Sequence, residues 1–279
     1  MTAVDFANFV DKLAAASGEA ILPFFRSSME IADKSGTEAG SRATFDPVTE
    51  ADRAAEAIMR RMIRETFPRH GIVGEEFGEH DPGAEYVWVL DPIDGTKSFI
   101  SGLPLWGTLI GLTHRGVPAY GMMHQPFTRE HFRGDGRAAH WQGPPAREPA
   151  LRGTGKAPVS ERRLRTRKCA ALAEATLMTT TPAMFSPAER ALYDSVEAGA
   201  RLARYGADCY AYCMLAAGHV DLVIESGLKP YDIVALIPII EGAGGVVTSW
   251  DGGSAAQGGA IVAAGDKALH EKVVAMLAG

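Results

Sequence analysis

The sequence is poor in cysteine and contains no long apolar run. Its three cysteines, Cys169, Cys209 and Cys213, are too few for a disulfide-stabilised scaffold. Cys209 and Cys213 are four residues apart, which is neither the redox spacing nor a usual zinc spacing, so we interpret them as buried apolar side chains. Because no stretch of about 18 apolar residues occurs, we expect no membrane span. The first residues also lack the basic start and apolar segment of a signal peptide, so we expect a protein of the reducing cytoplasm.

The sequence also lacks an excess of positive charge. Its formal net charge of −6 argues against a nucleic-acid-binding surface. Its eight histidines form no pair at metal-ligand spacing, which disfavours a zinc site. A hydrophobic content of 46% and a length of 279 residues fit one large or two modest globular domains. We predict an N-terminal unit over residues 1–140 and a C-terminal unit over 141–279, with the boundary in the stretch 134–158, rich in Gly and Pro.

Hydrophobic periodicity changes along the chain. Helical spacing predicts a helix over 4–30, with a break near Gly18, and a second helix over 50–66, with a loop or weak hairpin between them. Short strands are then expected at 86–90, 108–113, 117–124 and 130–133. The second half alternates, with strands at 169–173, 222–225, 246–249 and 260–264 and helices at 187–198, 208–218, 232–243 and 266–278. This order predicts a first half in which helices precede strands and a second half of α/β type.

Four acids follow apolar segments that we expect to be buried. Asp91 and Asp94 come directly after the apolar run 86–90, and Glu75 and Glu76 follow a short apolar pair at 72–73. Unpaired buried charges cost several kcal/mol, roughly, so a cation is expected beside them. Carboxylate oxygens without nearby histidine or cysteine suit Mg²⁺ better than Zn²⁺.

The spacing of the two aspartates narrows the chemistry. A turn at Pro92 can direct Asp91 and Asp94 into one space, and the Ile93 carbonyl adds a further oxygen. Backbone N–H groups at Gly95 and Thr96, at the start of a helix, suit an anion, which together with metal carboxylates indicates metal-assisted phosphoryl chemistry. Phosphatases that form an aspartyl-phosphate generally use Asp-x-Asp, so the Asp-x-x-Asp spacing favours an activated water as nucleophile.

Two further acids have two interpretations each. Asp232 follows Lys229-Pro230-Tyr231 and precedes an apolar helix, so it can be a helix N-cap, a metal ligand, or both. Asp208 also opens an apolar helix, where an N-cap is the alternative to a role in substrate binding.

The motifs together resemble those of the inositol monophosphatase family. They are Asp46-Pro47-Val48-Thr49-Glu50-Ala51-Asp52, Gly74-Glu75-Glu76, Trp88-Val89-Leu90-Asp91-Pro92-Ile93-Asp94-Gly95-Thr96 and Tyr231-Asp232-Ile233-Val234-Ala235. The resemblance implies an α+β fold with layered α-β-α-β-α sugar-phosphatase architecture. It also implies dependence on two or three Mg²⁺ ions, a small phosphate ester as substrate, and a homodimer.

The resemblance also implies roles for individual residues. One metal is held by Glu75, Asp91 and the Ile93 carbonyl, and the second by Asp91, Asp94 and Asp232. The attacking water is oriented and deprotonated by Thr96 and Asp52, Glu76 supports the metal ligands, and the N–H groups of Gly95 and Thr96 bind phosphate.

A departure within the motifs points to a branch of the family. Where many members have Trp, this chain has Tyr231, and the segments 206–212 and 225–230 look like those of histidinol-phosphate phosphatases. Histidinol phosphate carries an ammonium and an imidazole, so carboxylates are expected in its pocket, and Asp208 and Glu225 match family positions facing that end of the substrate. We therefore predict hydrolysis of L-histidinol phosphate in histidine biosynthesis. Inositol phosphate, a nucleotide 3′-phosphate and fructose bisphosphate are the alternative substrates.

Three further interpretations remain. A catalytically inactive metal-binding protein is disfavoured because every metal acid and Thr96 are present. The loop around Lys34 is either a flap over the site or a solvated surface loop. The basic run from Arg162 to Lys168 is either a solvated face or a phosphate-steering surface.

Overall fold

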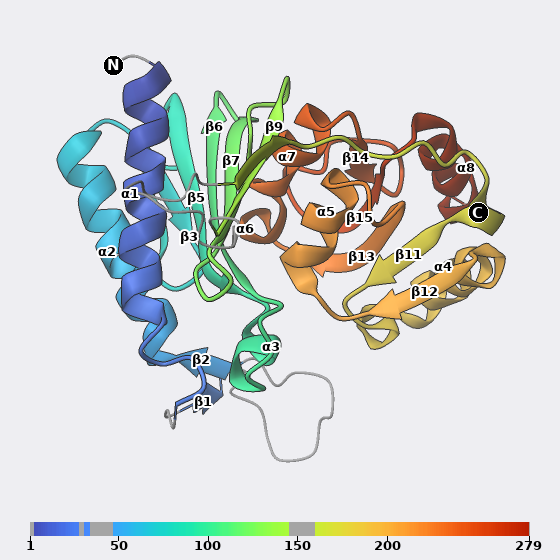
Figure 1. Cartoon of the computed structure of the whole chain (residues 1–279), viewed down its shortest axis with the longest axis horizontal. Coiled ribbons are helices and arrows are strands. Elements are labelled where there is room, and N and C mark those ends of the chain that lie inside the picture. Colours follow the sequence, from blue (N-terminus) through green and yellow to red (C-terminus); the bar gives the residue numbers. More distant parts are fainter. Residues whose placement is uncertain (1–2, 28–30, 34–46, 145–159, 279) are drawn as a thin grey trace, which may run out of the picture.

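The structure, a computed structural model, describes residues 3–27, 31–33, 47–144 and 160–278. Helices and sheets alternate in an α-β-α-β-α arrangement, as the sequence predicted (Figure 1). The loop around Lys34 lies outside the described residues, and so does Asp46. A short antiparallel pair flanks that loop, formed by β1 (Ile31–Asp33) and β2 (Pro47–Thr49), which confirms the predicted weak hairpin.

The first layer consists of two helices, α1 (Ala3–Ile21) and α2 (Glu50–Thr66), which cover one face of the large sheet. Their apolar stripes bury Val10, Leu13 and Met59 against Trp88 of the sheet. A helix whose apolar side chains recur every three or four residues gains most of its stability from such a face. The predicted end of the first helix near residue 30 and its predicted break near Gly18 were both wrong, since α1 ends at Ile21 and is continuous through Gly18.

The large sheet has eight strands and is mostly antiparallel. Its spatial order is β10 (Ser160–Arg163), β9 (Ala139–Gly143), β8 (Glu130–Gly134), β7 (Val117–Gln125), β6 (Gly107–His114), β5 (Tyr86–Asp94), β3 (Gly71–Gly74) and β4 (Gly78–His80). Strands β3 and β5 are parallel neighbours, so the ends that carry Glu75 and Asp91 lie at the same edge of the sheet. The last strand of this sheet along the chain, β10, ends at Arg163. The predicted division of the chain into units 1–140 and 141–279 stays a prediction.

A row of three glycines lets the middle helical layer approach this sheet closely. Gly111, Gly121 and Gly134 are partners across β6, β7 and β8. A Cβ at Gly121 would overlap the carbonyl oxygen of Ala235, and one at Gly134 would overlap backbone at Pro238. The backbone that follows Asp232 therefore lies directly on the sheet, which places that aspartate near the end of β5.

The middle layer consists of α5 (Asp208–Ala216), α6 (Pro230–Ile233) and α7 (Leu236–Gly242). Helix α7 packs on β7 and β8, and α5 packs on α7 and on the second sheet (Figure 1). The predicted single helix over 232–243 was wrong, because the helix is interrupted at residues 234–235. Pro238 has no N–H for the carbonyl of Val234 four residues earlier, which explains the interruption.

The second sheet has five strands, in the order β12 (Leu202–Tyr205), β11 (Thr176–Thr179), β13 (Leu222–Leu228), β15 (Gly259–Ala264) and β14 (Val246–Ser249). Its outer face is covered by α4 (Pro187–Gly199) and α8 (Lys267–Leu277). The predicted strand at 169–173 was wrong, since a 3₁₀ turn at Leu172–Glu174 comes first and the strand begins at Thr176. The helix-forming residues of the Ala-Leu-Ala-Glu stretch explain that delay.

Candidate active site

A cavity of about 360 Å³ opens where β5 ends between the two halves of the chain. All five predicted metal-ligand residues lie in its wall, together with Gly95, Thr96 and Asp208. The wall consists of Glu75, Asp91, Ile93, Asp94, Gly95, Thr96, Lys97, Thr180, Asp208, Gly227, Lys229, Tyr231 and Asp232. Residues separated by more than 150 positions thus meet in one concave site, as expected for a catalytic pocket.

The acids of the Asp91–Asp94 motif sit on a bulge of β5. The strand does not stop at residue 90, as the sequence suggested, but continues to Asp94 with a register shift between Asp91 and Asp94. The buried hydroxyl of Thr108 on β6 donates a 2.8 Å hydrogen bond to the Pro92 carbonyl inside the bulge. Ser17 of α1 bonds that hydroxyl in turn at 3.1 Å. A bulge redirects side chains, and here it brings both aspartates to the cavity.

Asp91, Asp94 and Asp232 form the acidic centre of the cavity. One carboxylate oxygen from each lies within 4.8 Å of those of the other two. Burial, and then the charges of Glu75, Asp94 and Asp232, raise the pKa of Asp91 well above its usual value. Burial also raises the pKa of Asp94 strongly and that of Asp232 to about 7. Carboxylates that repel one another in a low dielectric favour either protons or a cation.

The donor set fits a hard divalent cation. Among the described residues, none donates a hydrogen bond to the buried Oδ1 atom of Asp91. A buried carboxylate oxygen without a donor is costly unless a cation or a proton satisfies it. Neighbouring carboxylates and the wall position of Ile93 provide the all-oxygen environment that Mg²⁺ prefers.

Asp94 and Asp232 also stabilise helix starts. Asp94 Oδ2 accepts a 2.6 Å hydrogen bond from the backbone N–H of Cys209 in the first turn of α5. Asp232 Oδ2 accepts one of 2.6 Å from the N–H of Lys229, just before α6. The N-cap interpretation of Asp232 was wrong in position, because Lys229 is the N-cap of α6 and Asp232 is three residues further on. Its carboxylate nevertheless accepts the N–H of the N-cap residue, as in a capping box, and also lies close to the other acids.

Thr96 begins the short helix α3 (Thr96–Ile100), next to Gly95 with a positive φ of 87°. The Thr96 hydroxyl donates a 3.1 Å hydrogen bond to the Ile93 carbonyl. Asp52 is buried in the first turn of α2 and its charge acts on Asp91. Glu76 lies outside the cavity wall and pairs with Arg53 at 3.4 Å. The catalytic roles of these side chains stay predictions.

Asp208 enters the cavity from a strained turn. Gly206, Ala207 and Asp208 have consecutive positive φ angles of 86°, 85° and 43°. Two of these are not glycine, and such conformations cost about 1–3 kcal/mol each. The Asp208 carboxylate does not cap α5, so the N-cap alternative is wrong. It accepts long hydrogen bonds from Ser98 (3.3 Å) and Thr180 (3.4 Å) instead.

Glu225 lies behind Thr180. It is fully buried and accepts hydrogen bonds from the Thr180 N–H (2.9 Å), the Thr180 hydroxyl (2.5 Å) and the Tyr212 hydroxyl (2.9 Å). Burial raises its pKa to about 7, with the charge of Asp208 adding to the effect. Its predicted contact with substrate stays a prediction, and any such effect would pass through Thr180.

Sequence reasoning missed four residues of the wall. Lys97, Thr180, Gly227 and Lys229 line it without having been assigned roles. Their motif neighbours Thr96 and Asp232 were the available signal for Lys97 and Lys229. Thr180 follows a strand that the sequence placed several residues too early.

The basic run from Arg162 to Lys168 is not part of the cavity wall. Arg167 forms an ion pair with the buried Asp221 at 2.5 Å, and Arg162 lies over the Trp141 ring at 5.1 Å from the ring centroid. The five basic side chains of the run are exposed, which supports its interpretation as a solvated face. Within the described part of the chain, no helix has the length and apolar character to cross a membrane.

Comparisons with known proteins identify the family of the chain. The model of the inositol monophosphatase family matches residues 4–278. The chloroplastic bifunctional phosphatase IMPL2 of Arabidopsis thaliana is 42% identical over 98% of this chain and 75% of its own length. The histidinol-phosphatase of Mycobacterium tuberculosis is 34% identical over 85% and 86% of the two chains. The structure of an inositol monophosphatase from Zymomonas mobilis superposes with a TM-score of 0.82, at 36% identity and with 100% of both chains covered.

Proposed function

The chain belongs to the inositol monophosphatase family and is a phosphatase of that family, and from this premise we propose that it hydrolyses L-histidinol phosphate to L-histidinol and phosphate. Enzymes of the family use Mg²⁺, and the acidic centre described above fits that ion. L-histidinol phosphate as the substrate would place the enzyme in histidine biosynthesis. A homodimer and a cytoplasmic location are the further properties that we propose.

One Mg²⁺ would be held by Glu75, Asp91 and the Ile93 carbonyl, and a second by Asp91, Asp94 and Asp232. When bound, Mg²⁺ supplies positive charge that polarises phosphoryl oxygens and makes a water molecule more acidic. The Thr96 hydroxyl donates its hydrogen bond to the Ile93 carbonyl, so its oxygen keeps lone pairs that can accept a hydrogen bond from the attacking water and orient it.

The remaining steps follow from the same residues. Asp52 takes the proton of that water as it attacks phosphorus, and the ester P–O bond breaks. The departing alkoxide takes a proton from solvent. Backbone N–H groups of Gly95 and Thr96 bind the phosphate oxygens at the start of α3.

The observation that carries the substrate assignment is the state of Asp208. Its carboxylate lies in the cavity wall, and burial raises its pKa. The single proton of the Thr180 hydroxyl is committed to Glu225 by the shorter 2.5 Å bond, so the 3.4 Å contact with Asp208 is weak. Ser98 donates a further long hydrogen bond of 3.3 Å, and the charge of Lys97 lowers the pKa of Asp208, but within the described part of the chain neither makes a close contact with the carboxylate. An ammonium group of the substrate would add a charged partner, whereas the hydroxyls of a polyol have no charge to offer.

The comparisons support two candidates for the substrate. A histidinol-phosphatase is among the relatives, and the plant relative is named a bifunctional phosphatase, which is compatible with hydrolysis of a second phosphate ester. The 36% identity with an inositol monophosphatase makes inositol 1-phosphate the alternative. Asp208 distinguishes the two, because only histidinol phosphate has a cation for it.

The test compares histidinol phosphate with inositol 1-phosphate, using the wild type, Asp208→Asn and Asp208→Ala, in Mg²⁺ and in chelator. A hydrogen bond to a charged group contributes about 1.5–3 kcal/mol, so we expect kcat/KM for histidinol phosphate to fall by about 10- to 150-fold. Turnover of inositol 1-phosphate should change little. The matched control is Asp194→Asn, on the half-exposed side chain of α4, which should leave both activities unchanged. Equal losses on both esters in the Asp208 variants would refute the specificity role.

A further inference from the structure

A buried ion pair lies behind the turn that carries Glu75. One stripe of α2 carries Asp52, Glu56 and Arg60 at intervals of four residues, and all three are buried. The charge of Asp52 acts on Asp91 of the acidic centre, whereas Glu56 and Arg60 lie further along the helix, and none of the three belongs to the cavity wall. A buried ion pair is a poor source of stability compared with apolar side chains, so its presence here calls for another reason.

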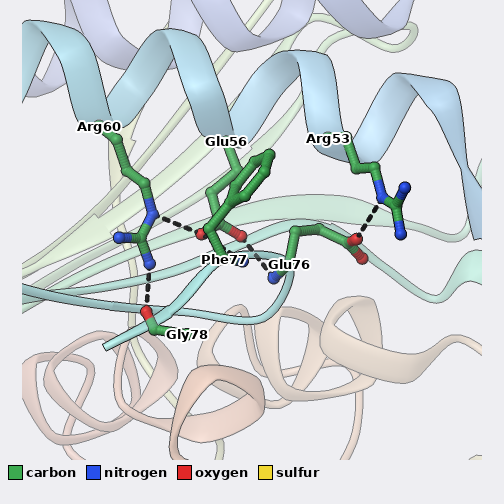
Figure 2. A network of polar contacts seen from close by, with 6 residues as sticks. All are labelled: Arg53, Glu56, Arg60, Glu76, Phe77 and Gly78. Atoms are coloured by element: carbon green, nitrogen blue, oxygen red, sulfur yellow. Dashed lines mark hydrogen bonds and ion pairs between the residues drawn. The ribbon is translucent and has the colours of Figure 1, made fainter. Parts of the chain in front are cut away.

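The carboxylate of Glu56 holds the backbone of the β3–β4 turn (Figure 2). Its Oε2 atom accepts a 2.7 Å hydrogen bond from the N–H of Glu76, and its Oε1 atom accepts one of 3.2 Å from the N–H of Phe77. Oε1 also accepts the Nε–H of Arg60 at 2.7 Å. Arg60 donates from its other end to the carbonyl of Gly78.

Glu75, the first residue of the turn, has its N–H bound by strand β5 and not by Glu56. The N–H of Glu75 donates a 3.2 Å hydrogen bond to the Leu90 carbonyl, directly before Asp91 on β5. All three N–H groups between β3 and β4 are therefore satisfied, one by β5 and two by Glu56. The Cα of Glu75 lies between these two anchors.

Gly74 makes this arrangement possible. A Cβ at position 74 would overlap the Oε1 atom of Glu56, so only glycine lets the carboxylate come this close to the strand. The glycine of the Gly-Glu-Glu motif and the buried Glu56 thus depend on each other.

We propose that Glu56, held by Arg60, is a positioning residue that fixes the Glu75–Phe77 turn so that the Glu75 carboxylate stays in the cavity wall beside Asp91. The inference rests on the proposed Mg²⁺ site but not on the identity of the substrate. Partners behind metal ligands typically change metal affinity by about 10- to 100-fold when removed. Here the partner acts through the main chain of the turn.

The test measures binding of Mg²⁺ alone to metal-free protein by titration calorimetry, with thermal unfolding in parallel. Glu56→Gln removes the charge and one of the acceptors, so we expect the Kd for Mg²⁺ to rise by about 10- to 100-fold. In steady-state assays the Mg²⁺ concentration for half-maximal activity should rise in the same proportion, while kcat at saturating Mg²⁺ falls less.

The matched control is Asp221→Asn. Asp221 is equally buried, pairs with Arg167 and accepts the N–H of Thr176 at 2.7 Å, but it lies outside the cavity wall. We expect its loss to lower the melting temperature and to leave the Kd for Mg²⁺ within about twofold. An equal rise in Kd in both variants would show a general loss of stability and overturn the proposal.

A second variant covers the case in which Glu56→Gln does not fold. Arg60→Lys keeps the positive charge beside Glu56 but replaces the two donor nitrogens of a rigid guanidinium by one ammonium nitrogen on a flexible chain, so it holds that carboxylate less firmly and we expect a rise in Kd of several-fold. Wild-type affinity in Arg60→Lys or in Glu56→Gln overturns the positioning role. A wild type that binds Mg²⁺ but does not hydrolyse histidinol phosphate overturns the substrate assignment alone.

Discussion

The stability of the protein should fall on mild acidification because of one buried histidine. His124 on β7 is only 6% exposed, and its ring lies 4.4 Å from that of His131 on β8. Burial, and then the charge of His131, lower the pKa of His124 from 6.5 to about 3. The folded state therefore keeps His124 neutral, while the unfolded chain takes up a proton below about pH 6.5.

The size of the effect follows from the two pKa values. They differ by about 3.5 units, and each unit corresponds to about 1.36 kcal/mol, so the ceiling is about 5 kcal/mol. The contribution is fully present above the unfolded-state pKa and is lost as the pH falls from about 6.5 towards 3. About 2 kcal/mol is already lost at pH 5, which is a large part of a typical stability of about 5–15 kcal/mol.

The measurement is urea unfolding at pH 7.5 and pH 5.0 for the wild type and for His124→Gln, whose amide nitrogen takes the place of the ring Nε2. The wild type should lose about 2 kcal/mol more than the variant between the two pH values. The buried acids Asp91, Asp94 and Asp232 have raised pKa values and act in the opposite direction. They are common to both proteins and cancel in the comparison. Identical pH dependence in the two proteins would refute a neutral, buried His124.

Two further predictions concern the site and the packing beneath it. Asp94→Asn should abolish Mg²⁺-dependent turnover without lowering the melting temperature in chelator. The substitution removes one of several carboxylates that repel one another, and it keeps an oxygen that accepts the N–H of Cys209. Normal turnover of the variant would show that Asp94 is not a metal ligand. Gly121→Ala should lower the free energy of unfolding by roughly several kcal/mol or prevent soluble expression, because its Cβ would overlap the Ala235 carbonyl. The control Gly83→Ala has open space around its Cβ and should change the free energy of unfolding by less than about 0.5 kcal/mol. Equal stability of the two variants in urea would contradict the close packing of α7 on the sheet.

Two acids of the acidic centre, and Glu75 beside it, could be predicted from the sequence because they break a local rule. Charged side chains directly after buried segments are costly, so Asp91, Asp94 and Glu75 stand out in the amino-acid sequence alone. The two helices of the first layer and the long strands of the large sheet were also predicted, since each has a strong periodic pattern of apolar residues.

Residues that obey local rules could not be found in this way. Glu56 and Arg60 have the spacing of an ordinary exposed helix pair, and only the packing of α2 on the β3–β4 turn shows that they are buried. Thr180 is an ordinary polar residue until its bonds to Glu225 are seen. The edge strand β12 is short and mostly exposed, so it has no alternating pattern to detect.

The turn before α5 has a consequence for engineering this enzyme. Ala207, the residue before α5, and Asp208, its first residue, both occupy a region of backbone conformation that disfavours residues with a Cβ. Methods that raise thermostability by replacing strained residues would choose these positions first, and glycine at either would relax the chain. Glycine at position 207 would loosen the backbone that directs the Asp208 carboxylate into the cavity, and glycine at position 208 would remove that carboxylate. Under the proposed role of Asp208, thermostability and choice of substrate would therefore compete at two adjacent residues.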